Sequence, residues 1–131
     1  RAAFVVDLQT SKKLGQVDVL SVTSTIGAPR LFALLDREPG ELTVSATSPR
    51  RGEELALDIH VRNLSSGACH VELLRPDGSV AAAYTRNILL KDGAAVFRQK
   101  PALNDPAGQW TARVTDVLTG RRIDTAFKVV E

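Results

Sequence analysis

Residues 104–130 alternate between apolar and polar side chains, and this alternation constrains the fold more than any other feature of the chain. The apolar positions are Trp110, Ala112, Val114, Ile123, Phe127 and Val129, and Thr119-Gly120 lies between the two runs. A period of two places successive side chains on opposite faces of a β-strand. The two runs therefore predict an antiparallel hairpin that is buried on one face and exposed to solvent on the other.

Shorter runs of the same kind precede this hairpin. We expect strands at residues 3–8, 14–22, 30–35, 42–47, 55–62, 68–74, 80–84 and 94–98, and no helix. Turn signals such as Pro76-Asp77-Gly78 and Lys91-Asp92-Gly93 separate them, and Gly15 favours a β-bulge within its strand. Many short strands with turns between them predict an all-β fold, specifically an immunoglobulin-like antiparallel β-sandwich of Greek-key type.

A polar joint, Asp36-Arg37-Glu38-Pro39-Gly40, interrupts the series of strands. A stretch of this kind, with proline and glycine among charged residues, marks a boundary between packed segments. The length of 131 residues suits one domain with an additional hairpin. We therefore expect an N-terminal β-extension over residues 1–38 and the sandwich over residues 39–131.

The composition excludes several classes of protein. The net charge is only +2 and aromatic residues make up 5% of the chain, whereas nucleic-acid-binding proteins carry dense basic surfaces with stacking aromatics. No apolar run approaches the roughly 20 residues of a membrane-spanning helix. The single cysteine, Cys69, alternates with Val71 and Leu73 and is expected to be a buried, unreactive thiol. No phosphate- or dinucleotide-binding glycine motif occurs, and we expect no cofactor.

The chain begins at Arg1 and contains no methionine. Since an intact gene product starts with methionine, we expect an excised domain or a mature part of a longer protein. The function of that longer protein then lies partly outside these residues, and the neighbouring domains of the same parent chain are the expected partners.

The two histidines are the strongest candidates for a metal site. If the strands on either side of Asn63–Gly67 paired as a hairpin, His60 would face His70 and Asp58 would face Glu72, a set that can bind zinc. Strands in these positions of an immunoglobulin-like sandwich often belong to opposite sheets, and the alternative is two surface histidines. Because no convergent carboxylates and no nucleophile motif are evident, we expect no metal, no catalytic residue and no enzyme activity.

Two aromatic residues and one apolar segment are candidates for binding. Exposed aromatic rings form platforms for sugar rings, so Trp110 and Tyr84 are the candidate ligand residues of a polysaccharide-binding module. Both alternate with apolar residues, however, which favours the core. The segment before the polar joint is apolar on both faces, as in a covered strand, and Leu31, Phe32 and Leu34 are therefore the candidates for an interface with a neighbouring domain.

Two turns of the chain share a sequence. The segments 7–13 and 116–122 both read Asp-x-x-Thr-small-basic-basic and both lie between predicted strands. Two hairpin turns that converged on the same chemistry explain this similarity, and a duplicated domain is the alternative.

Five segments after the polar joint occur in an order and spacing typical of a known family. They are Arg51–Glu53, Val71–Gly78, Lys91–Phe97, Pro106–Val114 and Thr125–Val129. With them, the chain resembles a macroglobulin-type, immunoglobulin-like domain of bacterial secreted proteins. The resemblance implies a β-sandwich accessory domain in a secreted, periplasmic or cell-surface protein. No segment resembles a thioester or bait region, so the resemblance does not imply protease trapping.

The segments Val6–Gly15 and Pro29–Leu35 are similar to small β-regions that follow the catalytic barrel in bacterial glycoside-hydrolase-like proteins, although Ser11 stands where that pattern has glycine. This similarity implies a location beside an enzyme. Together the two resemblances imply a non-catalytic accessory module that spaces or braces neighbouring domains. The alternatives are a carbohydrate-binding module and a protein-interaction or adhesion domain that joins through an edge strand.

Overall fold

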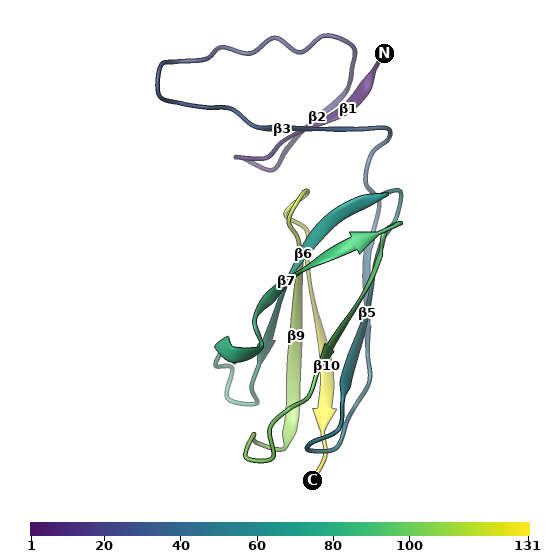
Figure 1. Cartoon of the computed structure of the whole chain (residues 1–131), viewed down its shortest axis with the longest axis vertical. Helices are drawn as coiled ribbons and strands as arrows, with labels where there is room; N and C mark the ends of the chain where they lie inside the picture. Colours follow the sequence, from purple (N-terminus) through teal and green to yellow (C-terminus); the bar gives the residue numbers. More distant parts are fainter.

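The computed structural model describes all residues from 1 to 131 and has two parts stacked along its long axis (Figure 1). The first part, here called the N-terminal unit, comprises residues 1–38. Its strands β1 (Ala3–Asp7), β2 (Lys12–Val17) and β3 (Phe32–Leu35) form an antiparallel sheet in the order β2-β1-β3. The second part, the sandwich unit, comprises residues 39–131 and lies beneath the N-terminal unit in the view.

Seven strands make up the sandwich unit, and every paired neighbour is antiparallel. They are β4 (Leu42–Ala46), β5 (Leu55–Val61), β6 (Ser66–Leu74), β7 (Arg86–Lys91), β8 (Ala94–Gln99), β9 (Gly108–Asp116) and β10 (Arg122–Val129). Their order across the sheet is β10-β9-β6-β7-β8-β5-β4. The predicted closing hairpin is confirmed, because β9 pairs with β10 and places Trp110 opposite Phe127.

The seven-stranded sheet folds over on itself. Strands β7 and β8 pair only at Lys91 and Ala94, beside the turn that joins them, so the sheet divides there into two layers. At the opposite edges β4 leads to Arg50, which forms a parallel bridge with Val130 just after β10. The result is an all-β, sandwich-like fold that is nearly closed into a barrel and is compatible with an immunoglobulin-like domain.

The core of the sandwich unit consists of the apolar residues that alternate along its strands. A single cluster contains 17 buried residues, and Trp110, Phe97 and Ile59 are among its most completely enclosed members. The predicted inward faces of β5, β6 and β9 are confirmed by the burial of alternate residues, and that of β10 by the burial of Phe127 and Val129, with Ile123 and Thr125 half-buried. Each large apolar side chain that is fully buried contributes roughly 1.5–3 kcal/mol, so this cluster is the main source of stability.

The N-terminal unit departs from the sequence prediction in two places. The predicted strand over 14–22 is wrong in its second half, because β2 ends at Val17 and residues 18–31 are exposed and almost free of regular structure. The predicted strand over 30–35 begins later than expected, because β3 starts at Phe32. Leu31 and Leu34 expose 62% and 68% of their surface, since no other part of the chain covers them, and their contact with a neighbouring domain stays a prediction. The predicted bulge is confirmed, because the β1–β2 register shifts beside Gly15.

Two predictions fail in the middle of the chain. The predicted strand over 80–84 is wrong, because Ala82–Tyr84 forms a short 3-10 helix, η1, and the buried residue there is Ala81. Strand β7 has no counterpart among the predicted strands. Strands β5 and β6 do not pair with each other, because β5 lies between β4 and β8 while β6 lies between β7 and β9; this agrees with the alternative in which the two strands belong to different layers.

The N-terminal unit rests on one end of the sandwich unit. Leu35, the last residue of β3, packs against the sandwich core. The turn after β1 touches the turn after β9, where a Cβ placed on Gly120 would lie 3.3 Å from Ser11 Oγ. An ion pair of 2.7 Å between Lys13 Nζ and Glu38 Oε1 fixes the start of the connecting segment. The two turns that share a sequence are therefore neighbours in space.

Candidate functional site

Trp110 belongs to the core and offers no surface for a ligand. It exposes only 1% of its surface, its indole N–H donates to the Pro106 carbonyl at 2.9 Å, and its ring lies 6.2 Å from that of Phe127 between centroids. A sugar platform needs an exposed ring face. The structure thus corrects the candidate role of Trp110 in polysaccharide binding and supports the core placement that its alternation favours.

Tyr84 is half-buried and holds a loop in place. Its hydroxyl donates to Asp105 Oδ2, and the backbone N–H of Ala102 donates to the Tyr84 oxygen at 3.0 Å and to Asp105 Oδ2 at 2.8 Å. Burial, followed by the hydrogen bond to Asp105, raises the pKa of Tyr84 above its ordinary value. The side chain therefore ties η1 to the loop before β9. Nothing in the sequence pattern points to this pairing.

The candidate interface residues lie together on the N-terminal unit. Leu31 and Leu34 are exposed, whereas Phe32 is half-buried. The Arg30 guanidinium lies over the Phe32 ring, 5.4 Å from its centroid, and reaches Asp7 Oδ2 at 2.8 Å. Arg30 therefore shields Phe32 and leaves the two leucines as the accessible apolar groups. Their role in an interface stays a prediction.

The two turns with a shared sequence are built alike. Asp7 Oδ1 accepts the Gln9 backbone N–H at 2.9 Å, and Asp116 Oδ1 accepts the Leu118 N–H at 3.1 Å. Both aspartates are buried. The second carboxylate oxygen differs, because it accepts from Arg30 in the first turn and from the Thr119 hydroxyl in the second. The same aspartate turn thus caps one hairpin in each unit.

Cys69 is buried on β6, as predicted from its alternation. Burial, with a smaller effect from the carboxylate of Asp116 on the neighbouring strand, raises the pKa of the thiol to about 11. The thiolate is the reactive form of cysteine, so this side chain is chemically protected.

The histidines do not form a pair. His60 lies between Thr43 and Ala94 across the sheet, whereas His70 Nδ1 lies 2.7 Å from Asn87 Oδ1 on β7. The condition for a zinc site, a hairpin of β5 and β6, is not met. No group of three or more His, Cys, Asp or Glu side chains is placed to hold a metal ion.

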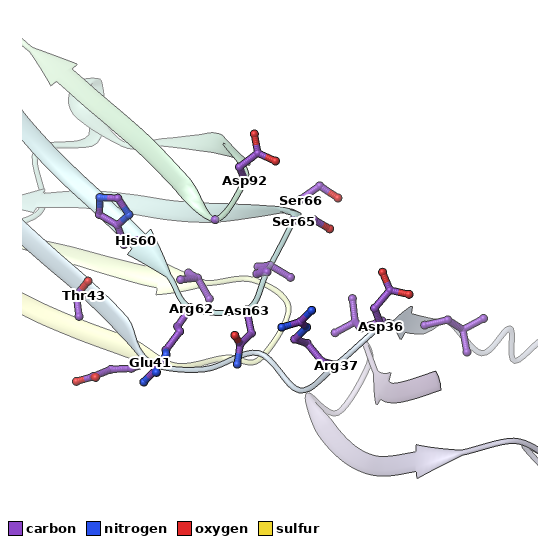
Figure 2. Close-up of a pocket in the computed structure, with 15 residues that line it drawn as sticks. Asp36, Arg37, Glu41, Thr43, His60, Arg62, Asn63, Ser65, Ser66 and Asp92 are labelled. Carbon is purple, nitrogen blue, oxygen red and sulfur yellow. The ribbon is translucent and has the colours of Figure 1, made fainter. Parts of the chain in front are cut away.

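A cleft of about 750 Å³ lies where the two units meet. Its walls come from four separate segments, as Figure 2 shows: Asp36 and Arg37 follow β3, Thr43 belongs to β4, His60 begins the segment that runs from β5 to β6, and Asp92 lies on the turn after β7. The volume falls within the range of small-molecule pockets, about 300–1,000 Å³. The sequence identifies each of these turns, and the joint over 36–40, as a separate feature. It does not indicate that they lie next to one another in the folded chain.

Turn chemistry shapes the sandwich wall of the cleft. Asn63 and Asp92 adopt left-handed backbone conformations, with φ of 60° and 51°. Asparagine and aspartate enter this region more readily than other residues, and Asp92-Gly93 forms the tight connection between β7 and β8. The positive φ angles are therefore explained by the turns themselves.

The cleft has the chemistry of a polar binding surface. Three carboxylates, Asp36, Glu41 and Asp92, face two guanidinium groups, and the only ion pair that any of them forms joins Asp36 to Arg1 at 3.2 Å. The guanidinium, amide and hydroxyl groups can donate hydrogen bonds to a polar ligand. No Phe, Tyr or Trp ring lines the cleft. A nucleophile would need a general base within hydrogen-bond reach, an arrangement that the serines of the cleft and His60 do not form.

No known protein family matches the chain, and no curated protein matches it either. The structure also contains no helix that could span a bilayer.

Proposed function

We propose that this chain is a non-catalytic accessory module of a larger, exported bacterial protein, a glycoside hydrolase or a relative of one, in which it spaces and braces neighbouring domains. In this proposal the sandwich unit is an immunoglobulin-like domain of macroglobulin type. The order of its strands supports the immunoglobulin-like part of this assignment, since β10-β9-β6-β7 corresponds to the G-F-C-C′ layer of such domains and β8-β5-β4 to the E-B-A layer; the macroglobulin type rests on the sequence resemblance alone.

The observation that carries the proposal is a strip of apolar side chains on the N-terminal unit. Its members are Val19, Leu20, Val22, Ile26, Leu31 and Leu34, all of them exposed; they are here called the apolar strip. They lie within 16 consecutive residues. The neighbouring three-stranded sheet has β2 and β3 as its outer strands, and neither pairs with a further strand. Single exposed apolar residues are common in proteins, but six of them within one short segment favour a surface that a partner covers.

The total exposed surface supports the same conclusion. A compact monomeric protein of 14.1 kDa is expected to expose about 6,700 Å². This chain exposes 7894 Å², an excess of about 1,200 Å² over that expectation. One partner in a stable protein–protein interface buries about 800 Å². The surplus is therefore large enough to be covered by a neighbouring domain.

Hydrogen exchange tests this proposal. Within residues 18–31, we expect the amides of residues 18–27 to exchange freely in the isolated chain and at least about tenfold more slowly in the parent polypeptide, because a docked domain would exclude water from them. The exposed loop around Leu103 serves as the control and should exchange at the same rate in both. Equal exchange of residues 18–31 in the two proteins would contradict the bracing role.

Carbohydrate binding remains a second candidate because of the cleft. Its guanidinium, amide and hydroxyl groups resemble the hydrogen-bonding set that recognises sugars, although Trp110 cannot take part. Affinity electrophoresis against soluble polysaccharides tests this alternative. A glycan that retards the unmodified chain should no longer retard Arg37→Ala but should still retard Leu103→Ala. Retardation that both variants preserve would place the binding elsewhere.

A further inference from the structure

We propose that β3 is an edge through which two copies of this chain pair, antiparallel, into one continuous sheet of six strands, three from each copy. This inference goes beyond the proposed function, because its partner is a second copy of the chain and not a neighbouring domain of the parent protein. It follows from a comparison of the free strand edges, from the backbone groups that β3 leaves unpaired, and from the sequence of β3 itself.

The free edges of the molecule differ in how well they are protected. Strand β2 carries Lys12, Lys13 and a bulge, which are the usual means of preventing an edge from pairing. Between β7 and β8, Arg86 bonds to the Arg98 carbonyl and stacks over Phe97, with its guanidinium carbon 4.3 Å from the ring centroid. The segments after β4 and β10 bond to each other. Strands β3 and β4 both lack a charge, a proline and a bulge, but β4 lies against β10, so only β3 is left without any such protection.

The outward backbone groups of β3 can be identified from its pairing with β1. The Leu8 N–H donates to the Leu31 carbonyl at 2.9 Å, and Val6 lies opposite Ala33 in the same register. Hydrogen-bonded pairs alternate along an antiparallel ladder, so Leu31, Ala33 and Leu35 bond inward. The N–H and C=O groups of Phe32 and Leu34 therefore point away from the sheet, along its free edge.

The sequence around β3 is complementary to itself in antiparallel orientation. With Ala33 opposite Ala33 of the second copy, Phe32 lies opposite Leu34 of that copy and bonds to it through the outward groups. The same register places Arg30 opposite Asp36 of the second copy, and the two could pair only by exchanging their present partners, Asp7 and Arg1. An aromatic residue opposite an aliphatic one and a pair of opposite charges both stabilise cross-strand pairing. Such an interface is isologous, as in most homodimers.

The pairing would also cover surface that is now exposed. Leu34 stands on the free edge, and Leu31 lies beside it in the same segment. In the paired sheet both leucines contact the second copy, and β3 changes from an edge strand into a central one. The excess exposed surface described above exceeds what one partner of a stable dimer buries.

Sedimentation equilibrium of the purified chain tests the proposal. We expect the weight-average mass to rise from the 14.1 kDa of one chain towards twice that value between about 1 μM and about 1 mM protein. Leu34→Pro removes the outward N–H, and an edge position tolerates proline; Leu34→Lys keeps the N–H but adds a charge. Both variants should raise the dissociation constant at least about tenfold.

Leu103→Lys is the matched control, because Leu103 is an equally exposed leucine on the sandwich unit and its change of charge is the same. It should leave the dissociation constant unchanged. Slow hydrogen exchange of Val5 and Val6 on β1 would show that the N-terminal unit of each Leu34 variant remains folded. If a variant loses that protection, Leu34→Ala, which keeps the N–H, replaces it.

The outcomes separate this proposal from the proposed function. A chain that stays monomeric throughout, or a dimer that the Leu34 variants leave intact, would overturn pairing through β3. The bracing role would still stand if residues 18–31 became protected in the parent polypeptide. Conversely, a β3 dimer together with unprotected residues 18–31 in the parent would support the pairing and remove the bracing role.

Discussion

The two units are built from the same kind of strand, but only one of them encloses its own core. In the sandwich unit the sheet folds over until β4 and β10 meet, and 17 buried residues form one cluster. In the N-terminal unit three strands bury Phe4, Val5 and Val6 outside that cluster, while the apolar strip remains uncovered. A suitable strand pattern alone does not make a sheet stable by itself, because its apolar face must also be buried against a second layer.

The glycines of the two units show the same contrast. A Cβ on Gly93 in the sandwich unit would lie 2.5 Å from the Val61 carbonyl oxygen, whereas nothing lies within 4 Å of a Cβ on Gly15 in the N-terminal unit. Both glycines have positive φ. An alanine at position 93 would therefore suffer both backbone strain and a steric clash, whereas an alanine at position 15 would suffer backbone strain alone. Comparing the two substitutions separates the effect of strain from that of packing.

Trp110→Ala should have the largest effect on stability and should confine it to the sandwich unit. Removing a fully buried aromatic side chain leaves a cavity, and we expect the free energy of unfolding to fall by about 3–5 kcal/mol. Urea denaturation followed by circular dichroism measures it. Leu103→Ala, a change at an exposed site, should stay within about 0.5 kcal/mol of the parent value. A loss below about 1 kcal/mol for Trp110→Ala would mean that the core is not closed as described.

Cys69 should report how well the sandwich unit excludes solvent. Because the pKa of its thiol is about 11, reaction with a disulfide reagent at pH 8 should be about 100-fold or more slower than that of a free cysteine. Unfolding in urea should restore the normal rate. Fast reaction in the native protein would show that β6 opens locally, and the contrast between the units would then weaken.

Gly93→Ala should destabilise the chain more than Gly15→Ala. We expect a loss of roughly 2 kcal/mol or more at Gly93, from left-handed strain together with a backbone clash. At Gly15 strain alone should cost about 1 kcal/mol, and it should appear as faster hydrogen exchange in β1 and β2 rather than as a shift of the main unfolding transition. Equal effects of the two substitutions would contradict the difference in packing.

Acid should loosen the N-terminal unit through Asp7. The Gln9 backbone N–H and the Arg30 side chain hold the pKa of Asp7 below its ordinary value. The folded state thus gains stability from the ionised carboxylate above the unfolded pKa, near 3.9, and loses it as the pH falls through the lower folded pKa. Hydrogen exchange of Val5 and Val6 should accelerate over this range. Asp7→Asn should remove that dependence; if it persists, another carboxylate is responsible.

The sequence identifies the strands of the sandwich unit where the alternation is long. Strands β5, β6, β9 and β10 each carry several consecutive inward and outward residues, and tertiary packing agrees with the local pattern. The segment 80–84 alternates for only two periods. There the hydrogen bond from Tyr84 to Asp105 favours a 3-10 turn, and the buried residue becomes Ala81.

The cleft and the open edge of β3 could not be predicted from local patterns. The cleft depends on how closely Arg37, Asn63 and Asp92 approach in space, although each is recognisable only as part of a joint or a turn. Strand β3 is apolar on both faces, a pattern that indicates a covered strand. The sequence therefore specifies that β3 needs a cover without specifying what supplies it.

The parallel bridge between Arg50 and Val130 has a mechanical consequence. The ends of the chain lie at opposite ends of the long axis (Figure 1), and the Arg51 N–H and the Val130 N–H donate to the Val130 and Pro49 carbonyls at 2.9 and 3.0 Å. Tension along that axis would load these bonds in shear, all at once. In the N-terminal unit Phe4 lies opposite Leu35, so the same tension would peel β1 from β3 one bond at a time. A stretched chain should therefore yield first at its N-terminal unit, while the sandwich unit continues to bear force.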